Sequence, residues 1–429
     1  MLAHSPPLPL LIDYSDYRAL CDITTEDEQS AILALKQRDR VRRVHLRMSI
    51  RSLWKLIGAI DEEYPILEYL IVHPKDFGLI SVLPETLQAP RLRHLVLGGF
   101  IIQMGSRLLP TAVSLVTLYL AVIHPTAYFC PFTLLVWLSS MPRLETLVIF
   151  FLYPVSNEEV ERLFAHNRIV APVTLTNLHR FTFQGYSTYL EGLLHHIITP
   201  RLKRLRIILP NPVTLSVPPL QQFINAAETF RFDRAKFKFS NGRVYVKAYP
   251  RIPRGESEIP ALSINANCML LEPVFDWQVS FAAQLSNSLS QTFSAVEHLT
   301  LERDRRSEEL NDVLRIEWRN LLCSFRNVKT LRIAHGIVED LSLCLQSKDG
   351  ELPLELLPEL QELTYSTRGN TGDAFTSFID VRQKAGRPIT LVRRSPSPDP
   401  DPGPNLPTSE TSLITPTLAA WEARNYYDA

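Results

Sequence analysis

A short pattern of apolar positions recurs along the chain. In PRLRHLVLGGF, residues 90 to 100, the apolar residues Leu92, Leu95 and Leu97 are separated by two variable residues and then by one. The last two positions are two residues apart, which is the period of a β-strand, and the first lies where the chain would bend into that strand. Nearly the same string returns as PRLETLVIFF at 142 and as PRLKRLRIIL at 200. Each copy therefore predicts one short strand.

The pattern fits twelve places, ten of them clearly, and the two weaker copies begin at Ala227 and Ile259. Successive copies begin 23 to 37 residues apart. The twelve units begin at Val41, Leu67, Leu92, Leu115, Leu144, Leu178, Leu202, Ala227, Ile259, Val296, Val328 and Leu360.

Stretches with helical spacing lie between the predicted strands. They include residues 49–63, 133–141 and 280–293, together with 156–167, where Ser156 and Glu159 form a capping-box pattern. A strand and a helix repeated every 20 to 40 residues is typical of leucine-rich repeats, which stack because one unit cannot bury its apolar face alone. We expect an α/β fold: a leucine-rich-repeat solenoid, or horseshoe, with a parallel sheet on the concave side and helices on the convex side. A doubly wound sheet is the alternative.

Three regions depart from the array, which we expect to span residues 41–394. Residues 1–40 are predicted to be an N-terminal cap or linker. Residues 236–249 alternate apolar and polar positions around Asn241-Gly242, which favours an inserted β-hairpin with strands at 237–239 and 244–246. Residues 395–429 begin with SPSPDPDPGPNLP, and this Pro/Ser-rich segment is predicted to be a disordered tail.

Composition restricts the possible partners and the compartment. Lys plus Arg and Asp plus Glu are both 45, so the net charge is zero, which argues against a nucleic-acid partner. No run of about 18 apolar residues is present, so no membrane span is expected. Five scattered cysteines and a start without signal-peptide features favour the cytoplasm or the nucleus. The basic cluster at residues 36–47 is either a solvated surface, a nuclear-import signal or a patch for an acidic partner.

The sequence contains few candidates for chemistry. It lacks phosphate-loop, dinucleotide, CxxC, HExxH and GxSxG motifs. The adjacent pair His195-His196 is expected at the end of a helix without a third metal ligand nearby, and the acidic run 61–63 is expected to be a solvated helix terminus. We therefore predict no enzymatic activity, no cofactor and no metal site.

The candidate binding surface is the predicted concave face. Residues between and just after the pattern positions should point away from the core there, forming an exposed apolar and aromatic strip flanked by arginines. Tyr and Arg commonly anchor protein interfaces, whereas β-branched residues are also ordinary on exposed sheets. We expect a protein partner with an acidic rim, bound by Arg43, His45, Tyr69, Ile71, His94, Tyr119, Val148, Phe150, Arg180, Arg204, Arg206 and Arg231.

Several phrases carry a family resemblance. They are SPPLPLLIDY, DITTEDEQSAILALKQRDRVRRVHLRM, DEEYPILEYLIV, LPETLQAPRLRHLVLGGF and LELLPELQELTY. Together they resemble the F-box-like leucine-rich-repeat proteins of mushroom-forming (basidiomycete) fungi, from about residue 4 to about residue 394. In that family an F-box docks on the adaptor of a cullin-type ubiquitin ligase, and the repeats select the protein to be tagged.

The first 40 residues lack the Leu-Pro start and the spaced apolar helices of an F-box. A cullin-ligase adaptor is therefore an expected partner only if an F-box precedes this sequence. The resemblance implies a substrate-recognition part of such a ligase. The residues themselves equally support a ligase-independent scaffold or competitor.

Overall fold

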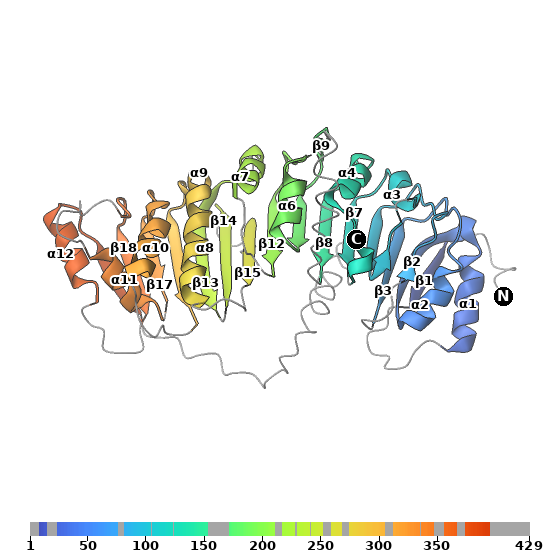
Figure 1. Cartoon of the computed structure of the whole chain (residues 1–429), viewed down its shortest axis with the longest axis horizontal. Coiled ribbons are helices and arrows are strands. Elements are labelled where there is room, and N and C mark those ends of the chain that lie inside the picture. Colours follow the sequence, from blue (N-terminus) through green and yellow to red (C-terminus); the bar gives the residue numbers. More distant parts are fainter. Residues whose placement is uncertain are drawn as a thin grey trace.

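The computed structural model shows a long sheet lined by helices (Figure 1). It describes residues 8–14, 24–75, 81–103, 105–122, 124–152, 171–210, 217–227, 230–240, 242–251, 259–267, 274–304, 312–334, 336–346, 356–366 and 374–394. The helix expected at 156–167 and the segment 395–429 lie outside these residues.

One large sheet organises the described part of the chain. It has fifteen strands, and two further pairs form small separate sheets, β4 (Ser81–Val82) with β6 (Phe100–Ile101) and β9 (Val173–Thr174) with β11 (Ile197–Ile198). In spatial order the strands of the large sheet are β1 (Leu10–Tyr14), β2 (Val41–Met48), β3 (Tyr69–Pro74), β5 (His94–Gly98), β7 (Thr117–Val122), β8 (Thr146–Phe151), β10 (Arg180–Gln184), β12 (Arg204–Leu209), β15 (Leu262–Asn267), β14 (Arg243–Pro250), β13 (Phe232–Ser240), β16 (His298–Arg303), β17 (Thr330–Ile333), β18 (Glu362–Ser366) and β19 (Thr390–Arg394).

The large sheet is almost entirely parallel. Within it, only the two pairings made by β14, with β13 and with β15, are antiparallel. Each of the twelve pattern copies supplies one strand of this sheet, so the α/β class predicted from the sequence is confirmed.

The first position of the pattern lies in a tight turn that leads into the strand, as three copies show. The backbone N–H of Leu92 donates to the carbonyl of Ala89 at 3.0 Å, and Leu144 and Leu202 make the same three-residue contact with Met141 and Thr199. The turn explains why this position precedes the strand pair by three residues instead of two. Its side chain still points into the core, where Leu92, Leu144 and Leu202 are fully buried.

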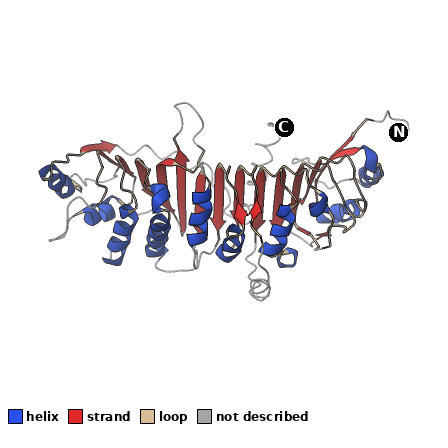
Figure 2. Ribbon diagram, turned by 90° about the horizontal axis from the view of Figure 1, so that it is seen from above, coloured by secondary structure: helices blue, strands red, loops and turns tan. Residues whose placement is uncertain are grey.

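The described helices line one side of the large sheet (Figure 2). Helix α2 shows how the sequence specifies them: Ser49 caps its N-terminus, and Leu53, Leu56 and Ile57 are buried at helical spacing. The helices are α1 (Thr25–Leu35), α2 (Ile50–Ile57), α3 (Leu108–Thr111), α4 (Pro131–Ser139), α6 (Ser187–Leu194), α7 (Val217–Ala226), α8 (Val274–Ser288), α9 (Ser290–Phe293), α10 (Asp312–Cys323), α11 (Val338–Leu345) and α12 (Thr376–Lys384), with 3-10 turns η2 (Arg38–Arg40) and η3 (Pro125–Ala127).

A continuous apolar core lies between the sheet and these helices. It runs from Ile12 on β1 to Ile389 before β19 and contains helix residues as well as strand residues. Every position of the twelve pattern copies is buried except Ile259, which is partly exposed. The repeated leucines therefore form the shared interior that their spacing predicted.

The predicted hairpin is larger than expected and is not an insertion outside the sheet. β13 and β14 pair along their length, with Gly242 at positive φ in the connection. Both are full members of the large sheet, because β13 also pairs with β16 and β14 with β15. After β12, the next strand in the chain, β13, lies three places along the sheet. β14 and then β15 occupy the two places between them, so β12 lies beside β15.

The sequence pattern missed the two strands at the ends of the sheet. β1 pairs with β2, and β19 pairs with β18. The segment 1–40, expected as a cap or linker, therefore contributes a strand as well as helix α1. Neither end strand carries the three-position pattern, which is why the repeat count did not include them.

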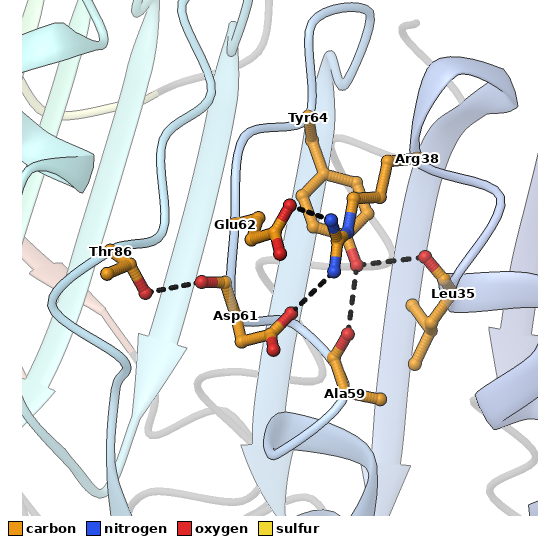
Figure 3. A network of polar contacts seen from close by, with 7 residues as sticks. All are labelled: Leu35, Arg38, Ala59, Asp61, Glu62, Tyr64 and Thr86. Carbon is orange, nitrogen blue, oxygen red and sulfur yellow. Dashed lines mark hydrogen bonds and ion pairs between the residues drawn. The ribbon is translucent and has the colours of Figure 1, made fainter.

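A polar network joins the segment after α1 to the next repeat (Figure 3). The Arg38 guanidinium pairs with Asp61, at 2.9 Å, and with Glu62. The buried Tyr64 hydroxyl donates to the carbonyl of Leu35 at 2.9 Å, and this burial raises its pKa to about 12. The acidic run at 61–63 is exposed after α2, as expected of a solvated terminus, and two of its carboxylates also pair with Arg38.

Candidate binding face

The strands present a second set of side chains on the side of the sheet opposite to the described helices. We call this side the helix-free face. It consists of the positions that alternate with the buried pattern residues. Because the strands are in parallel register, these residues form cross-strand rows. One row runs through Arg43, Tyr69, His94, Thr117, Thr146, Arg180 and Arg204, and the next runs through His45, Ile71, Val96, Tyr119, Val148, Thr182 and Arg206.

On β3, β5, β7 and β8 the helix-free face carries a second apolar cluster, separate from the main core. We call Ile71, Val96, Tyr119, Ala121, Val148 and Phe150 the apolar cluster. The Tyr119 and Phe150 rings lie 5.5 Å apart, and the partly buried Ile208 packs against the group. It contains strand residues alone, whereas the main core unites strands with helices.

The expectation that this apolar strip is exposed is wrong. The side chains of the apolar cluster are between 0% and 8% exposed, with Val96 at 0% and Tyr119 at 2%. Burial raises the pKa of the Tyr119 hydroxyl. Adjacent large side chains in register shield part of one another's surface across the strands, an effect that a list of outward positions does not include.

The N-terminal end of the helix-free face combines histidines, arginines and an aromatic stack. The rings of Tyr69 and His94 are stacked with centroids 4.6 Å apart, and the Arg43 guanidinium lies 5.6 Å from the Tyr69 ring. His45 is buried, with Nδ1 3.5 Å from a carboxylate oxygen of Asp13, so it too is less available than expected.

Two histidines at this end are held neutral. Burial lowers the pKa of His73 to about 3, and the neighbouring charges of Arg47 and His45 act in the same direction. Burial lowers the pKa of His94 to about 4, with Arg93 contributing. A neutral imidazole costs less to bury than a charged one, which accounts for both shifts.

Next to the apolar cluster lies a run of basic side chains. We call Arg180 on β10, Arg204 and Arg206 on β12, and Arg243 and Lys247 on β14 the basic strip. Register aligns Arg180 with Arg204, Arg206 with Ser263 on β15, and Ser263 with Lys247. From β10 to β14, every charged strand residue on the described helix-free face is basic. The face therefore changes from apolar to cationic within a few strands.

The contribution of β14 to this strip was not predicted. The hairpin was expected to be an insertion, so Arg243 and Lys247 were not placed on the same face as Arg204. Their alternation with buried Val244 and Val246 was the available signal. The β13 lysines add less charge, because Lys236 pairs with Glu302 at 2.7 Å and Lys238 with Asp304 at 2.9 Å.

The other predicted site residues have mixed positions. Arg180 and Arg206 are exposed and Arg204 partly exposed, as expected of binding residues. Arg231 is exposed but lies just before β13, outside the strands, so the structure does not join it to the cross-strand rows. His195 forms the C-terminal cap of α6, which agrees with the expected helix-end position.

Within the described ranges, no group of three or more His, Cys, Asp or Glu side chains is arranged to hold a metal ion. Among the described helices, none combines the length and apolar composition that crossing a bilayer demands. Of the cysteines described, Cys130 and Cys344 are buried and Cys323 is exposed, all as free thiols.

No protein-family model matches the chain, and no curated protein sequence matches it significantly.

Proposed function

We propose that the chain is a leucine-rich-repeat solenoid that binds a protein partner on its helix-free face. Three features support the repeat assignment: one strand for each pattern copy, near-continuous parallel pairing, and helices on one side of the sheet (Figure 2). In this proposal the helix-free face is the concave wall of the horseshoe. The reversal at β13–β15 is an irregularity within the array.

The observation that carries the binding proposal is the junction of the apolar cluster with the basic strip. Tyr119 and Phe150 contribute aromatic side chains to the apolar cluster, where they are 2% and 6% exposed, and Arg180, Arg204 and Arg206 provide cationic groups beside it. Aromatic and arginine side chains supply most of the energy at protein interfaces. The chemistry fits a partner segment in which apolar side chains lie next to acidic ones.

Family resemblance supports a more specific role for the same face. The phrases shared with basidiomycete F-box-like proteins lead us to propose that the chain is the substrate-recognition part of a cullin-type ubiquitin ligase, acting in the cytoplasm or the nucleus. A ligase-independent scaffold would use the same face. Co-purification distinguishes the two: recovery of the cullin adaptor with the protein expressed from its full gene supports the ligase role, and its absence supports the scaffold.

The binding face is tested by comparing matched variants in affinity purification from a basidiomycete extract. Tyr119→Ala removes an aromatic side chain of the apolar cluster, and Arg204→Glu reverses a charge of the basic strip. Val136→Asp, on the opposite side of the sheet at a position 49% exposed on α4, is the control. We expect each face variant to lose at least tenfold of the specifically bound protein, while the control retains it.

Thermal unfolding of each variant shows whether the fold is intact. If both face variants are folded and still hold all the protein that the wild type holds, binding occurs elsewhere on the molecule.

A further inference from the structure

The apolar cluster has the exposure of a covered surface. Val96 is 0% exposed and Val148 is 4% exposed, yet the described helices lie on the other side of the sheet (Figure 2). Apolar side chains on an uncovered sheet face normally retain more accessible surface than this, even with large neighbours. These low exposed fractions indicate that another segment or molecule covers the apolar cluster on the helix-free face.

Residues 395–429, which lie outside the described part of the chain, have the composition of that occupant. They contain five acidic residues and a single arginine, so their charge is opposite to that of the basic strip. They also contain an apolar and aromatic series near their end. Its members are Leu413, Ile414, Leu418, Trp421, Tyr426 and Tyr427.

The order of these features along the segment matches their order on the face. Moving from β19 toward β1, the basic strip comes first, on β14 to β10, and the apolar cluster follows, on β8 to β3. Along the chain from Arg394, Asp399, Asp401 and Glu410 precede the apolar and aromatic series, while Glu422 and Asp428 lie within it. A single extended run of the segment can therefore contact first the basic strip and then the apolar cluster.

The lengths also agree. With about 4.8 Å between neighbouring strands, β14 to β10 lie about 24–38 Å from β19, and β8 to β5 about 43–53 Å. Residues 395–407 contain six prolines, and an extended polyproline-type chain of that length spans about 40 Å at about 3.1 Å per residue. This stretch brings the remainder of the segment to the basic strip, and the following residues easily reach the apolar cluster.

We propose that residues 408–429 dock on the helix-free face of their own chain, with Glu410 on the basic strip and Trp421 and its aromatic neighbours on the apolar cluster. The segment is then an intramolecular competitor for any partner of that face. This proposal goes beyond partner binding and does not require that a partner exists. A partner would have to displace the segment, so its apparent affinity would be reduced by the fraction of molecules in which the face is occupied.

The test is photo-crosslinking within the full chain. Benzoylphenylalanine replaces Trp421, and the adducts are mapped by mass spectrometry. We expect the main adducts on peptides that contain Tyr119, Val148 or Phe150. Adducts confined to the helical side of the sheet, or scattered over the surface, would overturn the proposal.

Two further arms identify the occupant and the charge contribution. Mixing isotopically heavy and light protein separates adducts within one chain from adducts between copies. Predominance of heavy–light adducts would make a second copy the occupant and overturn the proposal.

The double substitution Arg204→Glu and Arg206→Glu should lower the adduct yield at least fivefold. The matched control Arg332→Glu, an exposed arginine on the same face of β17, should leave it unchanged. Equal adduct yields in both variants would show that the basic strip does not contribute to docking of the segment.

Discussion

Acidification should destabilise the N-terminal repeats through two histidines on the helix-free face. The folded protein holds the pKa of His73 at about 3 and that of His94 at about 4, whereas an unfolded histidine titrates near 6.5. Below pH 6.5 the unfolded chain therefore binds more protons than the folded chain. The contribution of these neutral imidazoles to stability is complete above pH 6.5 and is lost as the pH falls toward the folded pKa values.

The expected magnitude follows from these pKa values. Between pH 7.5 and pH 5, protonation stabilises each unfolded imidazole by about 2 kcal/mol, while the folded imidazoles remain almost entirely neutral. The two together lower the free energy of unfolding by about 4 kcal/mol. This is a large fraction of the stability of an ordinary domain, which is about 5–15 kcal/mol.

Hydrogen exchange measures the effect locally, which matters because repeat arrays open in units. The opening free energy of amides in β3 and β5 should fall by about 4 kcal/mol between pH 7.5 and pH 5, with little of that change at β17. The double variant His73→Gln and His94→Gln should remove most of the pH dependence. His298→Gln, at an exposed position on the same face, is the matched control and should not. A double variant as acid-sensitive as the wild type would show that His73 and His94 do not cause the acid sensitivity.

Three other substitutions test the packing. Arg382→Leu should lower the opening free energy of β18 and β19 by about 3–5 kcal/mol in hydrogen exchange. The reason is that the buried Arg382 guanidinium donates to the carbonyls of Leu357, Pro358 and Leu360. Lys384→Leu, at an exposed position on the same helix, is the control and should leave this free energy unchanged. Tyr64→Phe should lower the urea midpoint by an amount equivalent to about 1–2 kcal/mol, because the Leu35 carbonyl loses its donor, and no change would exclude that bond as stabilising. Leu205→Ala should lower the free energy of unfolding in urea by about 2–5 kcal/mol, whereas Arg206→Ala, one residue along the same strand, should lower it by under about 0.5 kcal/mol. Similar losses in both variants would contradict the placement of Leu205 in the core and Arg206 on the helix-free face.

The periodic part of the fold was predictable from the sequence. A leucine pattern such as Leu92, Leu95 and Leu97 encodes a turn, a strand and a buried side, and these are local properties. Repetition of the pattern then implies that the strands share one sheet. The end strands were not predictable in this way, because Leu10–Tyr14 and Thr390–Arg394 are recruited by pairing with a neighbour rather than by their own apolar pattern.

The order of strands at the hairpin was also beyond local reasoning. Asn241-Gly242 indicates a turn, but nothing in it specifies whether β13 pairs next with β12 or with β16. That choice depends on which neighbour completes the interior around Phe237 and Phe239. Because the choice was missed, Lys247 was not recognised as part of the basic strip.

Alternation predicted which candidate residues share a face of the sheet, but not how exposed each of them is. Alternation predicted that Tyr119, Val148 and Arg206 share a face, and their cross-strand register agrees. It did not predict that Tyr119 and Val148 are buried while Arg206 is exposed. Burial on a sheet depends on neighbours from other strands and on whatever lies over them, and neither is encoded by spacing within one strand.

The most direct test of partner binding places a photo-crosslinker on each side of the sheet. Benzoylphenylalanine is introduced at Thr182, between the apolar cluster and the basic strip, or at Val136 on the helical side, and the chain is irradiated with its co-purified partner bound. We expect partner adducts from position 182 and none from position 136. Adducts from position 136 alone would show that the partner binds to the helices and not to the helix-free face.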